Sequence, residues 1–250
     1  MPLRMIMSKD LAVRIGAVLG SMVDEALIAF TPEGLRIKAV DNAHIAMVEL
    51  NVDKGAFESF SSDDREIGID LERYSEFLKI ASAGDLVHLS LDEGSGKWVM
   101  VIGNVTRSMA PLSTKDWPSV KIPKLALEAK AILNSEELHR IVKATAGTAG
   151  GTFHGLGISI DPDFISMDAN GDTDSVSMRL AKDLLVSLEC QTHVCSKLPL
   201  DYIGNIAKAI PNGTLITMRL GDDLPLRLDF PIAEGKGQVS YYLAPLLEED

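Results

Sequence analysis

The sequence predicts an α+β fold made of two similar domains, each with antiparallel sheets and two helices. Three observations lead to this prediction. The chain has 250 residues, which suits two domains of ordinary size. A helix-then-strand pattern near the middle of the first half recurs in the second half. Much of the remaining chain alternates apolar and polar residues, as half-buried antiparallel strands do.

The internal repeat is clearest around two lysines, Lys79 and Lys208, which are 129 positions apart. Residues 71–91 align with residues 200–220 without a gap, and the two segments share three leucines, the lysine and a glycine five positions after the lysine. The shared pattern predicts a helix, a glycine that ends it and an alternating strand. A chance match between two amphipathic segments is the alternative.

Each half also begins with an amphipathic segment, since apolar residues recur there at helical spacing. Asn134-Ser-Glu-Glu137 has the composition of a capping box at the start of one of these segments. Helices are therefore expected over residues 9–23, 71–82, 135–149 and 198–210. Alternating runs predict half-buried strands, among them residues 35–40, 46–52, 98–102 and 226–230.

Residues 113–127 separate the two halves. Pro118 and Pro123 oppose both a helix and a central strand, so this stretch is expected to be an extended connector. The predicted domains are therefore residues 1–112 and 128–250.

Composition excludes several classes of protein. Hydrophobic residues make up 46% of the chain and charged residues 24%, but no run approaches the length that a membrane-spanning helix requires. The N-terminus reaches charged residues too early for a secretory signal, which predicts an intracellular protein. Two cysteines, Cys190 and Cys195, cannot build a disulfide framework.

Charge is unevenly distributed. The formal net charge of −12 argues against binding nucleic acid through a broadly basic surface. The four expected helices nevertheless carry seven basic and six acidic residues, so the acidity is concentrated elsewhere. Lysines and arginines that merely solvate their helices would explain this equally well.

No motif for catalysis or for a cofactor stands out. Phosphate-binding and nucleophile-elbow motifs are absent from the sequence, and residues 147–151 are interpreted as a flexible, glycine-rich helix exit. Cys190, His193 and Cys195 lack a fourth ligand in a recognisable pair, which disfavours zinc. His44 lies three residues after Asp41 without a nucleophile to serve, so we predict no catalytic residues, no metal and no cofactor.

The end of the chain carries the first recognisable family motif, Tyr241-Tyr242-Leu243-Ala244-Pro245. Four more occur in order along the chain: Asp41-x-x-His44, Leu71 to Lys79, Val120-Lys-Ile122-Pro123 and Asp223-Leu-Pro225-Leu. With these motifs the sequence closely resembles the proliferating cell nuclear antigen family, the DNA sliding clamps of archaea and eukaryotes, and most of all the archaeal type. The resemblance covers the whole chain.

The resemblance implies that three copies join head to tail into a closed ring, with the helices lining the bore and the sheets outside. In the family, an edge strand of the first domain, here near 105–112, pairs with one of the second domain, here near 176–182. The interface residues that it implies are Val105, Ser108, Val176, Met178 and Leu180.

The resemblance also implies that basic helix residues face double-stranded DNA inside the ring. Contacts to phosphates alone, at long range and through water, would be independent of sequence and would allow sliding. Gly20, Glu76 and Asp201 depart from the family, because several relatives are basic there, so a less basic bore is expected. The residues that match basic bore positions are Arg14, Lys79, Arg140, Lys143 and Lys208.

A second site implied by the resemblance is an apolar groove beneath the connector. In the family it binds a Gln-x-x-aliphatic-x-x-aromatic-aromatic peptide of polymerases, flap endonucleases and ligases, while a separate clamp loader opens the ring. On sequence alone such apolar residues would more often belong to a core, and the order of the family motifs is what favours a groove. The matching positions are Val40, His44, Ile45, Met47, Val120, Ile122, Pro123, Pro225, Tyr242, Ala244, Pro245 and Leu247.

The sequence therefore predicts a non-enzymatic sliding clamp and processivity factor for DNA replication and repair. It is expected to be a homotrimer in the archaeal cytoplasm at the nucleoid, or in the nucleus if the source is a eukaryote. Three alternatives stay open: a subunit that assembles only in a heterotrimer, a small α+β hydrolase or transferase that uses His44, and a monomeric peptide-binding module.

Overall fold

The computed structural model describes residues 2–115, 117–118, 120–122, 124–146 and 153–246. The chain forms two compact units, which interleave slightly instead of dividing at one point. Unit 1 comprises Met1–Asn42, Val48–Lys121 and Pro231–Val239, and unit 2 comprises Ala43–Met47, Ile122–Phe230 and Ser240–Asp250. The domain boundaries at residues 112 and 128 stay a prediction.

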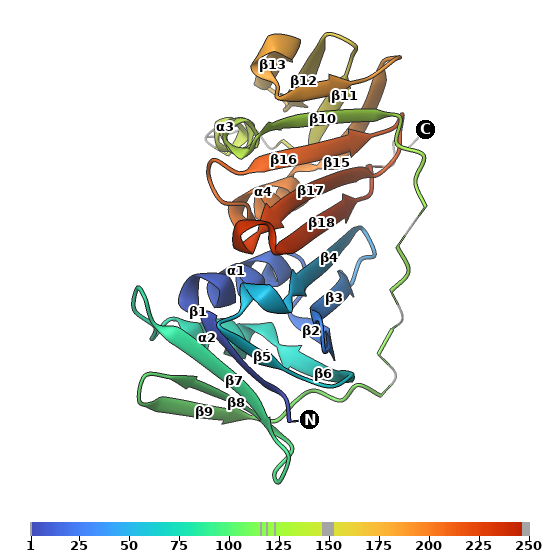
Figure 1. The fold of residues 1–250 in the computed structure, drawn as a ribbon. Coiled ribbons are helices and arrows are strands. Elements are labelled where there is room, and N and C mark those ends of the chain that lie inside the picture. The colour runs from blue at the N-terminus through green and yellow to red at the C-terminus, as the bar shows by residue number, and fades with distance from the viewer. Residues whose placement is uncertain (1, 116, 119, 123, 147–152, 247–250) are drawn as a thin grey trace. The chain divides into compact units, whose positions relative to one another are not determined.

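The internal repeat extends to all but one of the elements that the structure describes (Figure 1). The first copy consists of β1 (Arg4–Ser8), α1 (Lys9–Gly20), β2 (Glu25–Thr31), β3 (Gly34–Val40), β4 (Ala46–Asp53), η1 (Lys54–Ala56), β5 (Ser59–Ser61), β6 (Arg65–Asp70), α2 (Leu71–Leu78), β7 (Leu86–Asp92), β8 (Lys97–Ile102) and β9 (Val105–Met109).

The second copy repeats this order element for element. It consists of β10 (Ala129–Asn134), α3 (Ser135–Thr145), β11 (Gly155–Ile160), β12 (Phe164–Asn170), β13 (Ser175–Ala181), η2 (Lys182–Leu184), β14 (Ser187–Glu189), β15 (Val194–Pro199), α4 (Leu200–Ala209), β16 (Leu215–Leu220), β17 (Leu226–Ile232), η3 (Ala233–Gly235) and β18 (Gly237–Leu243). Only η3 has no counterpart, so the α+β repeat that the sequence predicts is confirmed.

Antiparallel pairing organises both copies. In the first, the strand order β5-β1-β7-β8-β9 forms one sheet and β4-β3-β2-β6 belongs to another. In the second, the corresponding orders are β14-β10-β16-β17-β18 and β13-β12-β11-β15. Strands β7, β8 and β9 make the meander visible in Figure 1. Strands β9 and β13 are the outermost strands of their sheets.

Three of the four α-helices in the described residues begin at a side-chain cap. Ser8, Asp70 and Asn134 each accept a hydrogen bond from a backbone amide of the first helical turn. The capping box expected at the start of α3 is half formed, because the Glu137 carboxylate instead accepts a hydrogen bond from Arg140. Helix α4 starts at Leu200 after Pro199, without a side-chain cap.

The helices are shorter than the apolar pattern predicted: α1, α2 and α3 each end three or four residues early. Hydroxyl groups explain two of these ends. Ser21 donates to the carbonyl oxygen of Val18 at 2.8 Å, and Thr145 donates to that of Val142 at 2.9 Å. Both take up carbonyl groups of the last turn. None of the described helices is long and apolar enough to cross a membrane.

Each unit has its own apolar core. In unit 1 the rings of Phe30 and Trp98 lie 5.9 Å apart between centroids, and in unit 2 those of Phe230 and Tyr241 lie 6.1 Å apart. Along β17, Leu226, Leu228 and Phe230 are buried while Arg227 points to the other face. The predicted alternation of apolar and polar residues in this strand is therefore confirmed.

Candidate functional site

The helices of each copy lie side by side: α1 contacts α2, and α3 contacts α4. Both pairs are joined by a hydrogen bond from a side chain to a helix carbonyl. The Tyr74 hydroxyl donates to the carbonyl oxygen of Ala12 at 3.0 Å, and His139 Nε2 lies 2.8 Å from the carbonyl oxygen of Ala207. Burial raises the pKa of Tyr74 well above its usual value. Each helix pair is thus a fixed platform for its exposed side chains.

Three of the five predicted DNA-facing residues are exposed lysines near helix ends: Lys79, Lys143 and Lys208. Lys79 and Lys208 each stand eight positions after the first residue of their helix, as the repeat predicts. Among the residues that the structure describes, none of the three lysines forms an ion pair. Their position also suits the negative end of the helix dipole, so location alone does not make them DNA-binding residues.

The two predicted arginines differ from the lysines. Arg140 is exposed, but its guanidinium lies 3.0 Å from the carboxylate of Glu137, which partly neutralises it. Arg14 is half-buried in α1. The lysines therefore offer the less compensated positive charge.

The C-terminal segment after β18 is held in place by two backbone hydrogen bonds. Ala244 N donates to the carbonyl oxygen of Ile45 at 2.8 Å, and Leu246 N donates to that of Lys197 at 2.7 Å. The first bond joins two of the predicted groove residues. His44, in the turn that precedes Ile45, is exposed and has a positive φ of 57°.

Unit 2 contains most of the predicted groove. Met47 and Tyr242 are buried, whereas Ile45, Ile122, Pro225, Ala244 and Pro245 are half-buried. Half-buried apolar side chains are available to a ligand in a way that core residues are not. Val40 and Val120 belong to unit 1, and Pro123 and Leu247 lie outside the described residues, as does the predicted glycine-rich exit at 147–151.

The predicted interface residues lie on the edge strands β9 and β13. Val105 is 45% exposed and Ser108 is exposed, while Val176 and Met178 are half-buried. The Leu180 side chain is only 5% exposed and packs within its own unit, so it can contribute only backbone groups to an interface.

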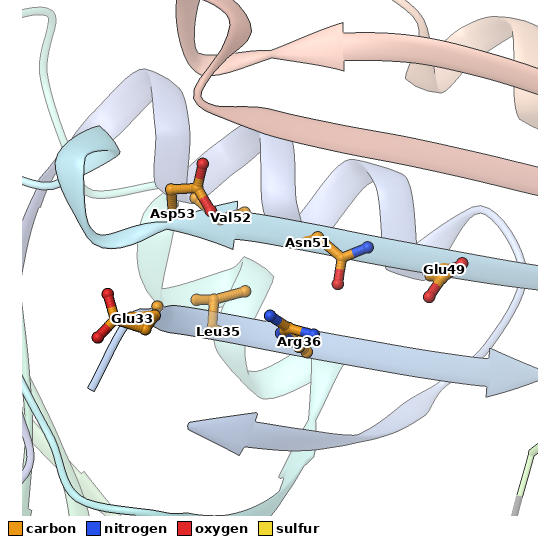
Figure 2. A pocket seen from close by; sticks show the side chains of 8 residues that line it. Glu33, Leu35, Arg36, Glu49, Asn51, Val52 and Asp53 are labelled. Atoms are coloured by element: carbon orange, nitrogen blue, oxygen red, sulfur yellow. The ribbon is translucent and has the colours of Figure 1, made fainter. Parts of the chain in front are cut away.

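A polar cavity of about 270 Å³, which the sequence did not predict, lies along β3 and β4 (Figure 2). Glu33, Glu49 and Asp53 line it together with Arg36. Two of the carboxylates already have cationic partners, since Glu33 lies 3.0 Å from Lys54 and Glu49 lies 3.8 Å from Lys38. Small-molecule sites are generally larger and more apolar, so the cavity does not suit one.

The cysteine segment offers little for metal binding. Burial, and next the negative charge of Asp161, raise the pKa of the Cys190 thiol, which disfavours the thiolate that binds metals. His193 Nδ1 lies 3.1 Å from Asp161 Oδ1, and the backbone amide of Cys195 donates a hydrogen bond to Asp222 Oδ1 at 3.1 Å. Within the described part of the chain, no group of three or more potential ligands gathers.

Comparison with family models matches both repeats. Residues 9–115 match the model of the proliferating cell nuclear antigen N-terminal domain, and residues 121–246 match that of the C-terminal domain. A Methanosarcina mazei protein named DNA polymerase sliding clamp is 38% identical over 237 residues, 94% of each chain. A Haloarcula marismortui protein of the same name is 36% identical over 232 residues, 92% of each chain.

Solved structures agree with this fold. A structure titled as the C-terminal region of FEN-1 bound to A. fulgidus PCNA superposes with a TM-score of 0.91 at 27% identity, covering 99% of this chain and 100% of the other. The Thermococcus kodakaraensis PCNA structure gives a TM-score of 0.89 at 23% identity, covering 98% of this chain and 100% of the other, which supports the fold alone.

Proposed function

The chain belongs to the proliferating cell nuclear antigen family, and we propose that it is the subunit of a DNA sliding clamp. In this role three copies form a closed ring around duplex DNA and hold polymerases and other replication and repair enzymes on it. The predicted domains, residues 1–112 and 128–250 with a connector at 113–127, are part of the same proposal.

One relationship between strands carries the proposal. Two hydrogen bonds bracket β4 and β18: Asp53 N donates to the carbonyl oxygen of Lys236 at 2.8 Å, and Ala244 N to that of Ile45 at 2.8 Å. Both residues of each pair belong to the same compact unit. Strands β4 and β18 are therefore neighbours, as the strand order also gives.

By the repeat, β13 is the counterpart of β4 and β9 is the counterpart of β18. Both counterparts are edge strands, so each carries a row of backbone groups that can pair with another chain. If β9 of one copy pairs with β13 of the next, the pairing of β18 with β4 is repeated between chains. Such head-to-tail contacts are heterologous, and they close into a ring when the rotation per copy fits.

The helix lysines give the ring its role towards DNA. Lys79, Lys143 and Lys208 are exposed in a chain whose net charge is −12. An acidic exterior repels DNA, while lysines in the bore attract phosphates without reading bases. Retention would then come from encirclement, and weak contacts would allow sliding.

We further propose that the apolar groove of unit 2 binds the Gln-x-x-aliphatic-x-x-aromatic-aromatic motif of partner enzymes. Two observations support this. The similar A. fulgidus PCNA structure is titled as bound to the C-terminal region of FEN-1, and apolar residues around Ile45 and Ala244 are half-buried here. Replacing Ile122 by Ala should weaken binding of such a peptide by about 1–3 kcal/mol. Leu184→Ala, at a 67% exposed leucine, is the control.

The proposal assigns no catalytic residue and no cofactor, and places the protein in the archaeal cytoplasm at the nucleoid. His44 is exposed in a turn, and the His44–Asp41 spacing gives it no nucleophile to activate. Turnover of a substrate that His44→Ala abolishes would instead support the hydrolase or transferase alternative.

The decisive experiment has two parts. Light scattering of the purified chain should give three times 27.0 kDa, or about 81 kDa, whereas a mass of one subunit at micromolar concentration contradicts the homotrimer. Rings loaded on closed circular DNA should stay bound until the circle is cut and should then slide off. Equal retention on cut and uncut DNA would reject encirclement.

A further inference from the structure

A row of basic side chains crosses one face of the sheet β14-β10-β16-β17-β18 in unit 2. Lys130 in β10 is directly opposite Arg219 in β16, and Arg219 is directly opposite Arg227 in β17. Directly opposite residues lie on the same face of a sheet. The side chains that alternate with them, such as Met218 and Leu228, are buried in the core. The basic row therefore lies on the face that points away from the core.

The row leads to a residue of the proposed partner groove. The guanidinium carbon of Arg227 lies 5.4 Å from the centroid of the Tyr242 ring, in β18. A guanidinium over an aromatic face is attracted to it and held flat against it. Arg227 is thus the point at which the basic row and the groove meet.

Among the described residues, two carboxylates form ion pairs with the row, one fewer than its cations. Glu189 Oε1 lies 2.8 Å from Lys130 Nζ, and this hydrogen bond lowers the pKa of Glu189, which keeps it ionised. Asp229 is shared, with its oxygens 3.0 Å from Arg227 and 3.5 Å from Arg219. In the part of the chain that the structure describes, these three cations and two carboxylates leave one positive charge, although the whole chain has a net charge of −12.

The position of this spare charge is fixed. Asp229 is 8% exposed and also accepts a hydrogen bond from the Ser240 hydroxyl, so it anchors both arginines. The side chains of Arg219 and Arg227 remain 36% and 37% exposed. Two arginines directly opposite each other repel, and a further carboxylate would relieve this repulsion through paired hydrogen bonds.

We propose that Arg219 and Arg227 bind a carboxylate of the partner peptide and so favour partner motifs that are flanked by Asp or Glu. This inference rests on the proposed function, because it extends the peptide groove at Tyr242. Charge complementarity and continuity with the groove carry it. In this role Arg227 determines specificity among partners and is not needed for the apolar anchors to bind.

The test is a binding scan by fluorescence anisotropy. The probes are labelled peptides that carry the motif flanked by Gly and Ser. In each peptide one flanking position, among the three on either side of the motif, is replaced by Glu or, in its matched partner, by Gln. The unmodified protein should bind the Glu peptide about 5-fold more tightly than the Gln peptide at one or more positions in low salt. The difference should shrink in high salt, because the contact is partly exposed.

Variants assign the preference to the row. Arg227→Gln should bring the Glu and Gln peptides to within about 2-fold of each other and leave affinity for the Gln peptides unchanged, whereas Arg227→Lys should retain part of the preference. Lys38→Gln, at an exposed lysine of β3, is the matched control and should keep the full preference for Glu peptides. In the Arg227→Gln variant, Asp229 keeps Arg219 and Ser240 as partners. If this variant fails to fold, Arg219→Gln, in which Asp229 keeps Arg227, takes its place in the test.

The outcomes separate this inference from the proposed function. If no motif peptide binds the unmodified protein, the proposed groove fails and this inference fails with it. If the peptides bind without a preference for Glu, or if Arg227→Gln keeps the preference, only this inference is overturned. A third outcome would also overturn this inference. In it the peptides show no preference for Glu, a short DNA duplex competes with them for the unmodified protein, and Arg227→Gln abolishes that competition, so that the row binds phosphate.

Discussion

The hydroxyl of Tyr74 in α2 donates a hydrogen bond of 3.0 Å to the carbonyl oxygen of Ala12 in α1. Gly16 makes room for this contact, because a Cβ atom there would lie 3.1 Å from Cε1 of the Tyr74 ring. The tyrosine side chain is almost fully buried, and its hydroxyl fixes the register of the two helices that carry Arg14 and Lys79.

Tyr74→Phe should lower the free energy of unfolding by about 1 kcal/mol, because it removes one buried hydrogen bond and leaves the ring in place. Urea unfolding followed by circular dichroism measures this. Tyr74→Ala, which also leaves a cavity, should cost about 3–5 kcal/mol. A Tyr74→Phe variant as stable as the unmodified protein would show that the hydrogen bond contributes nothing.

The same residue predicts a dependence on alkaline pH. Burial raises the pKa of Tyr74 in the folded chain above its usual value of 10.0, so only the unfolded chain ionises this group just above that pH. Stability should therefore fall as the pH rises beyond 10 towards the raised pKa. Comparing the unmodified protein with Tyr74→Phe between pH 9 and 11 isolates this group. Parallel curves for the two proteins would contradict the prediction.

Gly34 at the start of β3 should tolerate no side chain. Its φ is +144°, and a Cβ atom there would lie 2.1 Å from the carbonyl oxygen of Val52. Gly34→Ala should therefore destabilise unit 1 by more than about 1 kcal/mol. Gly20→Ala is the control, because Gly20 ends α1 with no atom within 4 Å of its Cβ position, and it should stabilise by about 0.5–1 kcal/mol. Equal thermal midpoints for the two variants would refute this.

Local patterns in the sequence were enough to predict the repeat and most elements. The helix that begins at Leu71 and the one that begins at Leu200 were found from apolar spacing and a following glycine, and both are present. The helix ends were wrong, because hydroxyl groups such as those of Ser21 and Thr145 take up the last carbonyl groups. Apolar periodicity does not register such contacts.

Contacts between distant residues could not be predicted in the same way. Alternation placed Arg227 on one face of its strand, but nothing near it in the sequence indicates that Ser240 and Arg219 share its partner Asp229. The groove residues were recognised only through family motifs, because half-buried Ile45 and Ala244 look like core residues until strand pairing brings them together. Strand register supplies that information, and it is set by the whole sheet.

The edge strand β13 predicts how the ring would be broken. Val176 is half-buried opposite Ala169 of β12, so Val176→Asp places a carboxylate where the next copy should pack. An unpaired charge buried there should cost several kcal/mol and reduce the mass in light scattering towards one subunit. Leu215→Asp, at a 48% exposed leucine of a strand inside its sheet, should leave the trimer intact. A Val176→Asp protein that keeps the mass of three subunits would place the interface elsewhere.

The helix lysines predict a defect on DNA that leaves assembly unchanged. Replacing Lys79, Lys143 and Lys208 together by Ala removes nine positive charges from the bore of a trimer, since each of three copies loses three. Loading on circular DNA or stimulation of a polymerase should fall, and the remaining activity should depend less on salt, because fewer phosphate contacts are made.

A matched variant separates the effect of the helix lysines from the effect of the net charge. Lys38, Lys54 and Lys97 lie outside the α-helices, in β3, the 3-10 turn η1 and β8, and their combined replacement by Ala changes the net charge by the same amount. That variant should load and stimulate like the unmodified protein, and both variants should keep the trimer mass and the affinity for the motif peptide. Because phosphate attraction falls off within a Debye length of about 10 Å, only charges that line the bore can reach the duplex. An equal loss of activity in the two variants would show that total charge, and not the helix face, governs the interaction with DNA.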